Sequence, residues 1–190
     1  PTLNSSEELA ACLGSLSEGL SAGLIRELIV TDGGSNDATL VLAEEAGAIV
    51  LHGQKSRGGQ LHRGCAAAQG DWLLVLHADT RLQTGWAESV ISHVGGKTER
   101  AGYFQLTYRA DGMSARIVAG WANMRSRFFG LAYGDQGLLI PTDLYQSVGG
   151  FSDIPLMEDV DLVRRLKGRL VRLDAVASTS AEKYLVQGWL

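Results

Sequence analysis

Short apolar runs that alternate with helical segments constrain the fold of this chain more than any other feature. The runs lie at 27–31, 48–51, 72–76 and 137–140, and glycine-rich turns and helical patterns separate them. Runs this short cannot span a membrane, and they read as buried strands. Strands that alternate with helices at this spacing predict an α/β fold, doubly wound and Rossmann-like, with a mostly parallel sheet and helices on both faces.

The same patterns predict where the other elements lie. Helices are expected at 6–18, 37–46, 57–70, 85–94, 113–129, from 142 onward and at 158–168, with further strands at 101–109 and 169–174. A chain of 190 residues fits one domain, whereas two would be cramped. The chain opens on a loop sequence, "PTLN", and "YLVQGWL" stops in mid-pattern. We therefore expect residues 1–190 to be a single domain that lacks its first strand and its C-terminal tail.

Composition narrows the class of protein. Apolar residues make up 45% and charged residues 20%, which is typical of a globular chain, and a net charge of −4 argues against nucleic acid as a partner. No signal peptide is visible and no apolar run approaches membrane-spanning length, so a cytoplasmic protein is expected.

The strand at 72–76 runs directly into "HADT", which places His77 and Asp79 at its end. A half-buried carboxylate there needs a positive partner, and a divalent cation that bridges to a diphosphate is one solution. The imidazole of His77 suits Mn²⁺ better than Mg²⁺. The alternative is that Asp79 caps the next helix and His77 only packs.

A second loop, "TDGGSNDAT", follows the strand at 27–31 and places Asp32 at that strand's end. This carboxylate could accept a hydrogen bond from a base or a ribose, or the loop could simply cap the next helix. Ligands bind outside the carboxyl ends of such strands, so Asp32 and Asp79 are expected in one crevice. Neither a P-loop nor a G-x-G-x-x-G motif is present.

Two charged segments lie at the starts of predicted helices. "KSRGGQLHRG" contains basic and amide side chains that suit a diphosphate, although a solvated basic turn is the alternative. "PLMEDVDL" contains carboxylates that could include a general base, although acidic residues in a first helical turn are also ordinary. The residues concerned are Lys55, Arg57, Gln60 and Arg63 in the first segment and Glu158, Asp159 and Asp161 in the second.

Two further segments could meet an acceptor. "YGDQG" groups the polar residues Tyr133, Asp135 and Gln136 ahead of a strand. The helix at 113–129 mixes basic and aromatic residues, among them Trp121 and Phe128, and could form an acceptor wall or a membrane-facing patch. An ordinary helix with a buried face and a polar rim is the alternative.

The order of these motifs resembles glycosyltransferase family 2. "PTLN", "ELIVTDGGSNDAT", "RGGQLHRGCAAAQGDWLLVLHADT" and "GGFSDIPLMEDVDLVRRL" follow one another over residues 1–168. The chain is most similar to small bacterial members that carry His-Ala-Asp-Thr in place of Asp-x-Asp. The resemblance implies the GT-A fold, an inverting transfer from a nucleotide-diphospho-sugar, and a divalent metal, Mn²⁺ or Mg²⁺.

The resemblance also implies a role for individual residues. In the family, the matching residues contact the nucleotide, hold the metal and remove the acceptor proton. The implied nucleotide contacts are Pro1, Thr2, Asn4, Asp32, Arg57 and Gln60. The implied metal ligand is Asp79, and His77 stands in place of the first aspartate of the metal motif. The implied base is Asp159, with Glu158 and Asp161 as its supports.

Besides His77, the chain departs from the family pattern in three places. Ser5 stands where many relatives have Glu, Gly33 replaces the second Asp of Asp-Asp-Gly-Ser, and the Gln-x-x-Arg-Trp motif of processive synthases is absent. A single, non-processive transfer to a hydroxyl acceptor is expected. A lipid-linked acceptor and peripheral association with the inner membrane face stay open. A sugar-1-phosphate nucleotidyltransferase and a non-catalytic nucleotide-sugar-binding protein are the alternatives.

Overall fold

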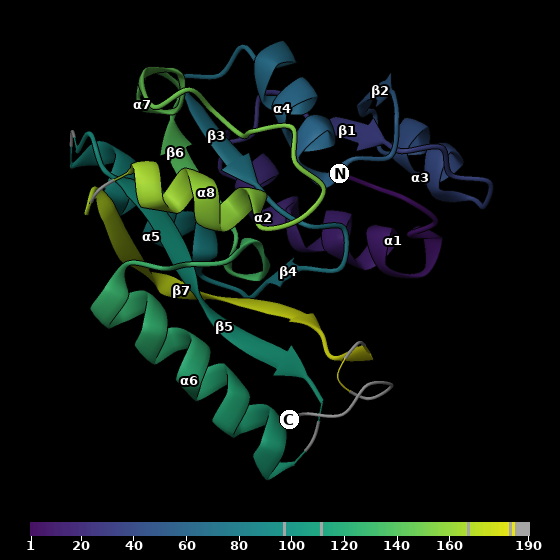
Figure 1. Ribbon diagram of the computed structural model, residues 1–190. Coiled ribbons are helices and arrows are strands. Elements are labelled where there is room, and N and C mark those ends of the chain that lie inside the picture. The colour runs from purple at the N-terminus through teal and green to yellow at the C-terminus, as the bar shows by residue number, and fades with distance from the viewer. Residues whose placement is uncertain (97, 111, 167, 183, 185–190) are drawn as a thin grey trace.

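Two sheets form the frame of the molecule (Figure 1). A computed structural model describes residues 1–96, 98–110, 112–166, 168–182 and 184, so the stretch 185–190 of "YLVQGWL" lies outside the described residues. A two-stranded sheet pairs β1 (Ile29–Asp32) with β2 (Ile49–His52). A five-stranded sheet has the order β3-β6-β5-β7-β4, where the strands are β3 (Trp72–Val75), β4 (Arg81–Leu82), β5 (Ala101–Arg109), β6 (Leu138–Pro141) and β7 (Leu170–Ser180).

Helices connect these strands, and most lie where the sequence patterns place them. Ser56 caps α4 by accepting a hydrogen bond from the Gly59 N–H, and Gly130 ends α6 in the left-handed conformation. None of the described helices combines the length and the apolar character needed to cross a membrane. The helices are α1 (Ser6–Ser15), α2 (Ser17–Ser21), α3 (Thr39–Glu45), α4 (Arg57–Ala67), α5 (Trp86–Gly95), α6 (Met113–Phe129), α7 (Thr142–Ser147) and α8 (Glu158–Arg165), with a 3-10 turn η1 at Gly134–Gln136.

The strand directions correct the predicted mostly parallel, doubly wound sheet. β6 runs antiparallel to both β3 and β5, and β4 runs antiparallel to β7. Among the strands that the structure describes, only the β1–β2 and β5–β7 pairs are parallel. The chain comes back through α6 to the start of β5, where Leu138 lies opposite Tyr103, and β6 leaves from there in the opposite direction. An apolar run looks the same in either direction, so its pattern cannot fix the direction of a strand.

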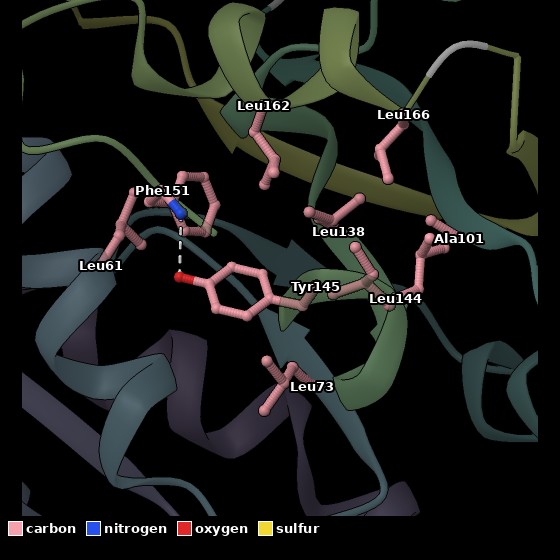
Figure 2. Close-up of a cluster of buried hydrophobic side chains, with 10 residues drawn as sticks. Leu61, Leu73, Ala101, Leu138, Leu144, Tyr145, Phe151, Leu162 and Leu166 are labelled. Carbon is pink, nitrogen blue, oxygen red and sulfur yellow. Dashed lines mark hydrogen bonds between the residues drawn. The ribbon is translucent and has the colours of Figure 1, made fainter. Parts of the chain in front are cut away.

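One hydrophobic cluster fixes α8 to the five-stranded sheet. Figure 2 shows Leu162 of α8 and Leu166, the residue directly after α8, pointing into this cluster, and both side chains are fully buried. In the same cluster the Tyr145 hydroxyl accepts a hydrogen bond of 2.9 Å from the Phe151 N–H. The loop at 148–151 and α8 are therefore both held by the core.

An apolar cavity lies between the two sheets. Its volume is about 350 Å³, and side chains of β1 and β3, among them Val30, Leu73 and Val75, line it. Thr2 also lines this cavity and pairs with β1 in a parallel bridge: its N–H donates to the Thr31 carbonyl at 2.9 Å, and its carbonyl accepts from the Gly33 N–H at 3.0 Å.

Candidate active site

The ends of β1 and β3 bring two of the predicted loops together. Ala78, within "HADT", packs against the cluster of Leu9 and Val30, and the backbone carbonyl of His77 lies 3.6 Å from the Cys12 Sγ. Asp32, at the end of β1, is in direct contact with Thr2 of the first loop. The "HADT" segment therefore lies beside β1, although β1 belongs to the smaller sheet, and the placement of Asp32 and Asp79 in one crevice stays a prediction.

The carboxylate of Asp32 organises the first loop. It is fully buried and accepts four hydrogen bonds: from Thr2 Oγ1 (3.0 Å), from the Gly34 N–H (2.7 Å), and from the N–H and the hydroxyl of Ser35 (2.7 and 2.5 Å). A carboxylate offers about four lone-pair sites, so these donors occupy its acceptor capacity. A nucleotide base could pair with Asp32 only if a hydroxyl, such as that of Ser35, turned away.

Burial and hydrogen bonding act on the pKa of Asp32 in opposite directions. Desolvation favours the neutral acid and raises the pKa, whereas the hydrogen bonds from Ser35, Gly34 and Thr2 stabilise the anion. The hydrogen bonds prevail, and the pKa lies below its usual value. Asn4 extends the same loop at the surface, where its Oδ1 accepts from the Asn36 N–H at 2.9 Å.

Gln60, predicted near a diphosphate, lies beneath the loop instead of facing solvent. Its side chain is 4% exposed, and its Nε2 donates to the carbonyls of Thr2 (2.9 Å) and Thr31 (2.8 Å). These two bonds attach α4 to both the first loop and β1. Gln60 thus holds the predicted nucleotide-binding loops in place from below.

Arg57 connects the start of α4 to the start of α8. Its Nε lies 3.9 Å from Glu158 Oε1, and its side chain is half exposed while that of Glu158 is buried. The second carboxyl oxygen of Glu158 is buried and has no hydrogen-bond partner among the described residues. A buried carboxylate with one distant cation is costly unless a further positive charge approaches it.

Asp159, the predicted base, sits at the first turn of α8 against the loop before β6. Its Oδ2 accepts from the Gly134 N–H at 2.6 Å, and its Oδ1 accepts from the Val160 N–H at 2.7 Å. Each oxygen keeps a lone pair for a further donor. Because Leu162 and Leu166 anchor α8 in the core, the position of this carboxylate is fixed.

His77 faces the same place as Asp159. The two side chains line one small cavity of about 20 Å³ together with Tyr133 and Gly134. His77 Nδ1 lies 3.4 Å from Asp135 Oδ1. His77, predicted at the metal, and Asp159, the predicted base, therefore lie close to each other. Tyr133 and Asp135 of the predicted acceptor segment lie beside them.

The backbone of Asp79 is held by a hydrogen bond from Arg109. Its carbonyl accepts from Arg109 Nη1 at 2.8 Å, and its side chain is half-buried. Within the ranges that the structure describes, no three His, Cys, Asp or Glu side chains gather closely enough to hold a metal by themselves. The pairing of Asp79 with His77 as metal ligands stays a prediction.

Gln136, predicted on the acceptor side, and Asp161, predicted as a support of the base, take part in the protein's own hydrogen bonds. Gln136 is fully buried, accepts from the Ser126 hydroxyl at 2.5 Å and donates to the Phe104 carbonyl at 3.2 Å. Asp161 accepts from the Ser152 hydroxyl and from Arg165 Nη2, both at 2.7 Å. Tyr133 differs, because its ring lies under the guanidinium of Arg125, 3.4 Å from the ring centre, beside the small cavity.

Sequence reasoning missed the ion-pair network behind "HADT". Glu8 of α1 accepts from Arg81 Nη2 at 2.8 Å and from Arg109 Nη2 at 2.7 Å. Arg109 also donates to the carbonyls of Asp79 and Ser178, so it holds the loop from the far end of β5. The position of Arg109 at the end of the predicted strand 101–109 was the available signal.

Comparison with known proteins places the chain among glycosyltransferases. The family profile described as "Glycosyl transferase family 2" matches residues 1–144. A PGL/p-HBAD biosynthesis glycosyltransferase of Mycobacterium bovis (strain BCG) is 37% identical over 89 residues, which are 43% of this chain and 34% of that protein. A TPR repeat-containing protein of Synechococcus elongatus is 41% identical over 85 residues, 43% of this chain and 20% of that protein. These matches span about a third or less of the relatives' length.

Solved structures share the fold over nearly the whole chain. The crystal structure of a mycobacterial protein is 25% identical and has a TM-score of 0.60, covering 95% of this chain and 63% of that one. TarS 1–349 of S. aureus in complex with UDP is 16% identical, with a TM-score of 0.68 over 97% of this chain and 60% of that one. Glucosyl-3-phosphoglycerate synthase from M. tuberculosis, in complex with Mn²⁺, UDP and glucosyl-3-phosphoglycerate, is 22% identical, with a TM-score of 0.62 over 95% and 68%.

Proposed function

The chain belongs to glycosyltransferase family 2 and has a GT-A-like α/β fold, and from this premise we propose that it transfers a sugar from a nucleotide-diphospho-sugar to an acceptor hydroxyl. We propose further that the transfer is metal-dependent, inverts the anomeric centre and occurs once per encounter. UDP-sugars are the first donors to consider, because two structural neighbours were solved with UDP.

The position of Asp159 is the observation that carries this proposal. A carboxylate at the start of a core-anchored helix accepts one hydrogen bond at each oxygen and lines a cavity with His77 and Tyr133. A general base must be positioned rigidly and must keep a lone pair for the proton that it removes. Asp159 meets both conditions.

In the proposed reaction the acceptor hydroxyl gives its proton to Asp159. The hydroxyl oxygen attacks the anomeric carbon from the face opposite the diphosphate, and the bond from that carbon to the diphosphate oxygen breaks. The leaving nucleoside diphosphate takes the electron pair, so a single displacement inverts the configuration. Glu158 and Arg57 lie beside this centre, and Arg57 is exposed enough to meet the departing phosphate.

The residues of "HADT" fit a divalent cation as partial ligands. Asp79 offers a carboxylate on a loop fixed by Arg109, and His77 offers an imidazole next to Asp135. Oxygen donors suit Mg²⁺ and Mn²⁺, and an imidazole favours Mn²⁺. Asp79 and His77 would hold this cation together with diphosphate oxygens, and its charge would favour departure of the nucleoside diphosphate.

The nucleotide side of the site is assigned to the two loops at the end of β1. Pro1, Thr2 and Asn4 form the first loop, and the bonds of Asp32 and Gln60 fix its shape. In this proposal Asp32 fixes the shape of the loop that receives the nucleotide base. It contacts the nucleotide base itself only if a hydroxyl, such as that of Ser35, turns away.

The Asp159→Asn variant tests the proposal. The amide cannot accept the proton, so transfer from UDP-hexoses, measured as release of UDP in the presence of Mn²⁺, should fall by about 10²–10⁴-fold. Nucleotide affinity, measured by calorimetry, should stay unchanged. Asp143→Asn is the matched control, since Asp143 also lies in a first helical turn but on the exposed face of α7. Unchanged turnover in Asp159→Asn would show that Asp159 is not the general base.

A further inference from the structure

The outer face of α6 carries an apolar stripe. Met113, Ile117, Trp121, Met124 and Phe128 have exposed fractions of 77%, 63%, 62%, 40% and 72%. They follow one another at intervals of three or four residues, so at 100° per residue they fall within about 80° of the helix circumference. The other large exposed apolar residues of the described chain belong to different elements.

The inner face of α6 carries small residues instead. Ala115, Ala119, Ala122 and Ser126 are buried, and α6 lies along β5 (Figure 1). A surface helix normally turns its large apolar residues toward the core. In α6 the large apolar side chains face outward, which is costly in water and marks an interaction surface.

The charges of α6 are all of one sign. Its sequence, "MSARIVAGWANMRSRFF", contains three arginines and no acidic residue, although the whole chain carries a net charge of −4. Arg116 and Arg127 are exposed and project from one flank of the stripe, while Arg125 projects from the other flank. An apolar stripe flanked by arginines suits an interface between an apolar phase and anionic groups.

We propose that α6 binds the surface of an anionic lipid bilayer. The stripe enters the boundary between headgroups and acyl chains, where Trp and Phe are favourable, and Arg116 and Arg127 contact lipid phosphates. Two α6 helices packed face to face would bring their arginines together, and this like-charge repulsion disfavours a two-fold dimer through the stripe, whereas lipid phosphates attract the same arginines. The helix lies in the plane of the membrane and does not cross it.

This surface is coupled to the candidate active site through one loop. The Ser126 hydroxyl binds Gln136, Arg125 covers the ring of Tyr133 and its Nε donates to the Leu131 carbonyl at 3.2 Å, all from α6. The same loop supplies the Gly134 N–H that binds Asp159. A bilayer bound at α6 would therefore lie roughly one helix diameter, about 10 Å, from that loop. This geometry favours an acceptor hydroxyl carried by a lipid, an extension that rests on the proposed function, whereas membrane binding does not.

Flotation of the full chain with lipid vesicles tests the membrane surface. Vesicles of phosphatidylcholine with about 30% phosphatidylglycerol should bind the protein at least about tenfold more tightly than phosphatidylcholine alone, because two arginines contribute at the surface. Ile117→Ser/Trp121→Ser should lose binding to both. Arg116→Gln/Arg127→Gln should lose only the preference for the anionic vesicles, and salt should weaken that preference in the wild type.

A double variant of isolated exposed residues, Leu20→Ser/Val41→Ser, is the matched control and should bind like the wild type. The stripe variants should keep their circular dichroism and their affinity for UDP, which separates a loss of membrane binding from a loss of the active site. Equal vesicle binding by Ile117→Ser/Trp121→Ser and the wild type would overturn the proposal. So would a lipid-free dimer that the same substitutions dissociate, because the stripe would then be a subunit interface.

Discussion

Gln60 and Asp32 determine, residue by residue, the shape of the loops at the end of β1. The amide of Gln60 supplies donors to two buried carbonyls, and Asp32 supplies acceptors to two backbone N–H groups and two hydroxyls. Both residues are buried, so neither set of bonds can be replaced by water at no cost.

Replacing Gln60 with alanine should therefore destabilise the fold. Gln60→Ala leaves the carbonyls of Thr2 and Thr31 without this donor, and we expect a loss of about 2–3 kcal/mol in the free energy of unfolding. Urea denaturation measures it. Gln54→Ala, at an exposed position in the same connection, should change stability little. A loss equal to that of the control would show that Gln60 does not hold the loop.

The depressed pKa of Asp32 predicts a pH dependence with a definite sign. Because the pKa is lower in the folded state than in the unfolded state, where it is about 3.9, the carboxylate stabilises the fold above that value. This contribution is lost as the pH falls through the folded pKa. Asp32→Asn should thus be less stable than the wild type near pH 7, and the difference should narrow below about pH 4. Urea midpoints across this range test it, and a constant difference would contradict the assignment.

At the scale of elements, the contact between the 131–137 loop and α8 defines the candidate catalytic centre. Gly134 is the residue that permits this contact, because a Cβ at this position would lie 2.5 Å from His77 Nε2 and 3.4 Å from Asp159 Oδ2. The loop is held by α6 and the helix by the core, so the two sides of the centre are positioned independently.

Gly134→Ala should push the 131–137 loop away from α8. The added methyl group forces His77 away, and we expect turnover to fall by at least about tenfold through misplacement of the catalytic groups, with nucleotide affinity retained. Gly120→Ala is the matched control: a Cβ there meets no atom, and alanine in a helix should stabilise α6 by about 0.5–1 kcal/mol. Normal turnover in Gly134→Ala would mean that the loop contact does not define the centre.

The elements themselves could largely be predicted, because each has a local signal. The helices at 57–70 and 113–129 and the strand at 101–109 appear close to their expected bounds. β4 was missed because two residues make no pattern, and β7 continues to Ser180, beyond the expected end at Asp174, because pairing with β5 extends it. Periodicity does not report pairing, so it could not reveal either feature.

At the scale of the whole molecule, strand direction and side-chain partners are set by contacts distant in sequence. The mixed sheet could not be predicted from the sequence, because the direction of β6 depends on where the chain re-enters the sheet after α6. The convergence of "HADT" with α8 followed from the resemblance to a family, whereas the buried bonds of Gln60 and Gln136 carry no sequence signal. Polar residues near a ligand site and polar residues that support it look alike in a sequence.

The proposed function requires a metal-assisted nucleotide site at the ends of β1 and β3. Calorimetric titration of the protein with UDP, with and without Mn²⁺, tests this most directly. We predict binding that requires Mn²⁺ and weakens by at least about tenfold in Asp79→Ala, as for the loss of a metal-site residue. Asp71→Ala, at the opposite end of β3, should bind like the wild type. No binding of any nucleoside diphosphate, or equal binding without metal and in Asp79→Ala, would contradict the account.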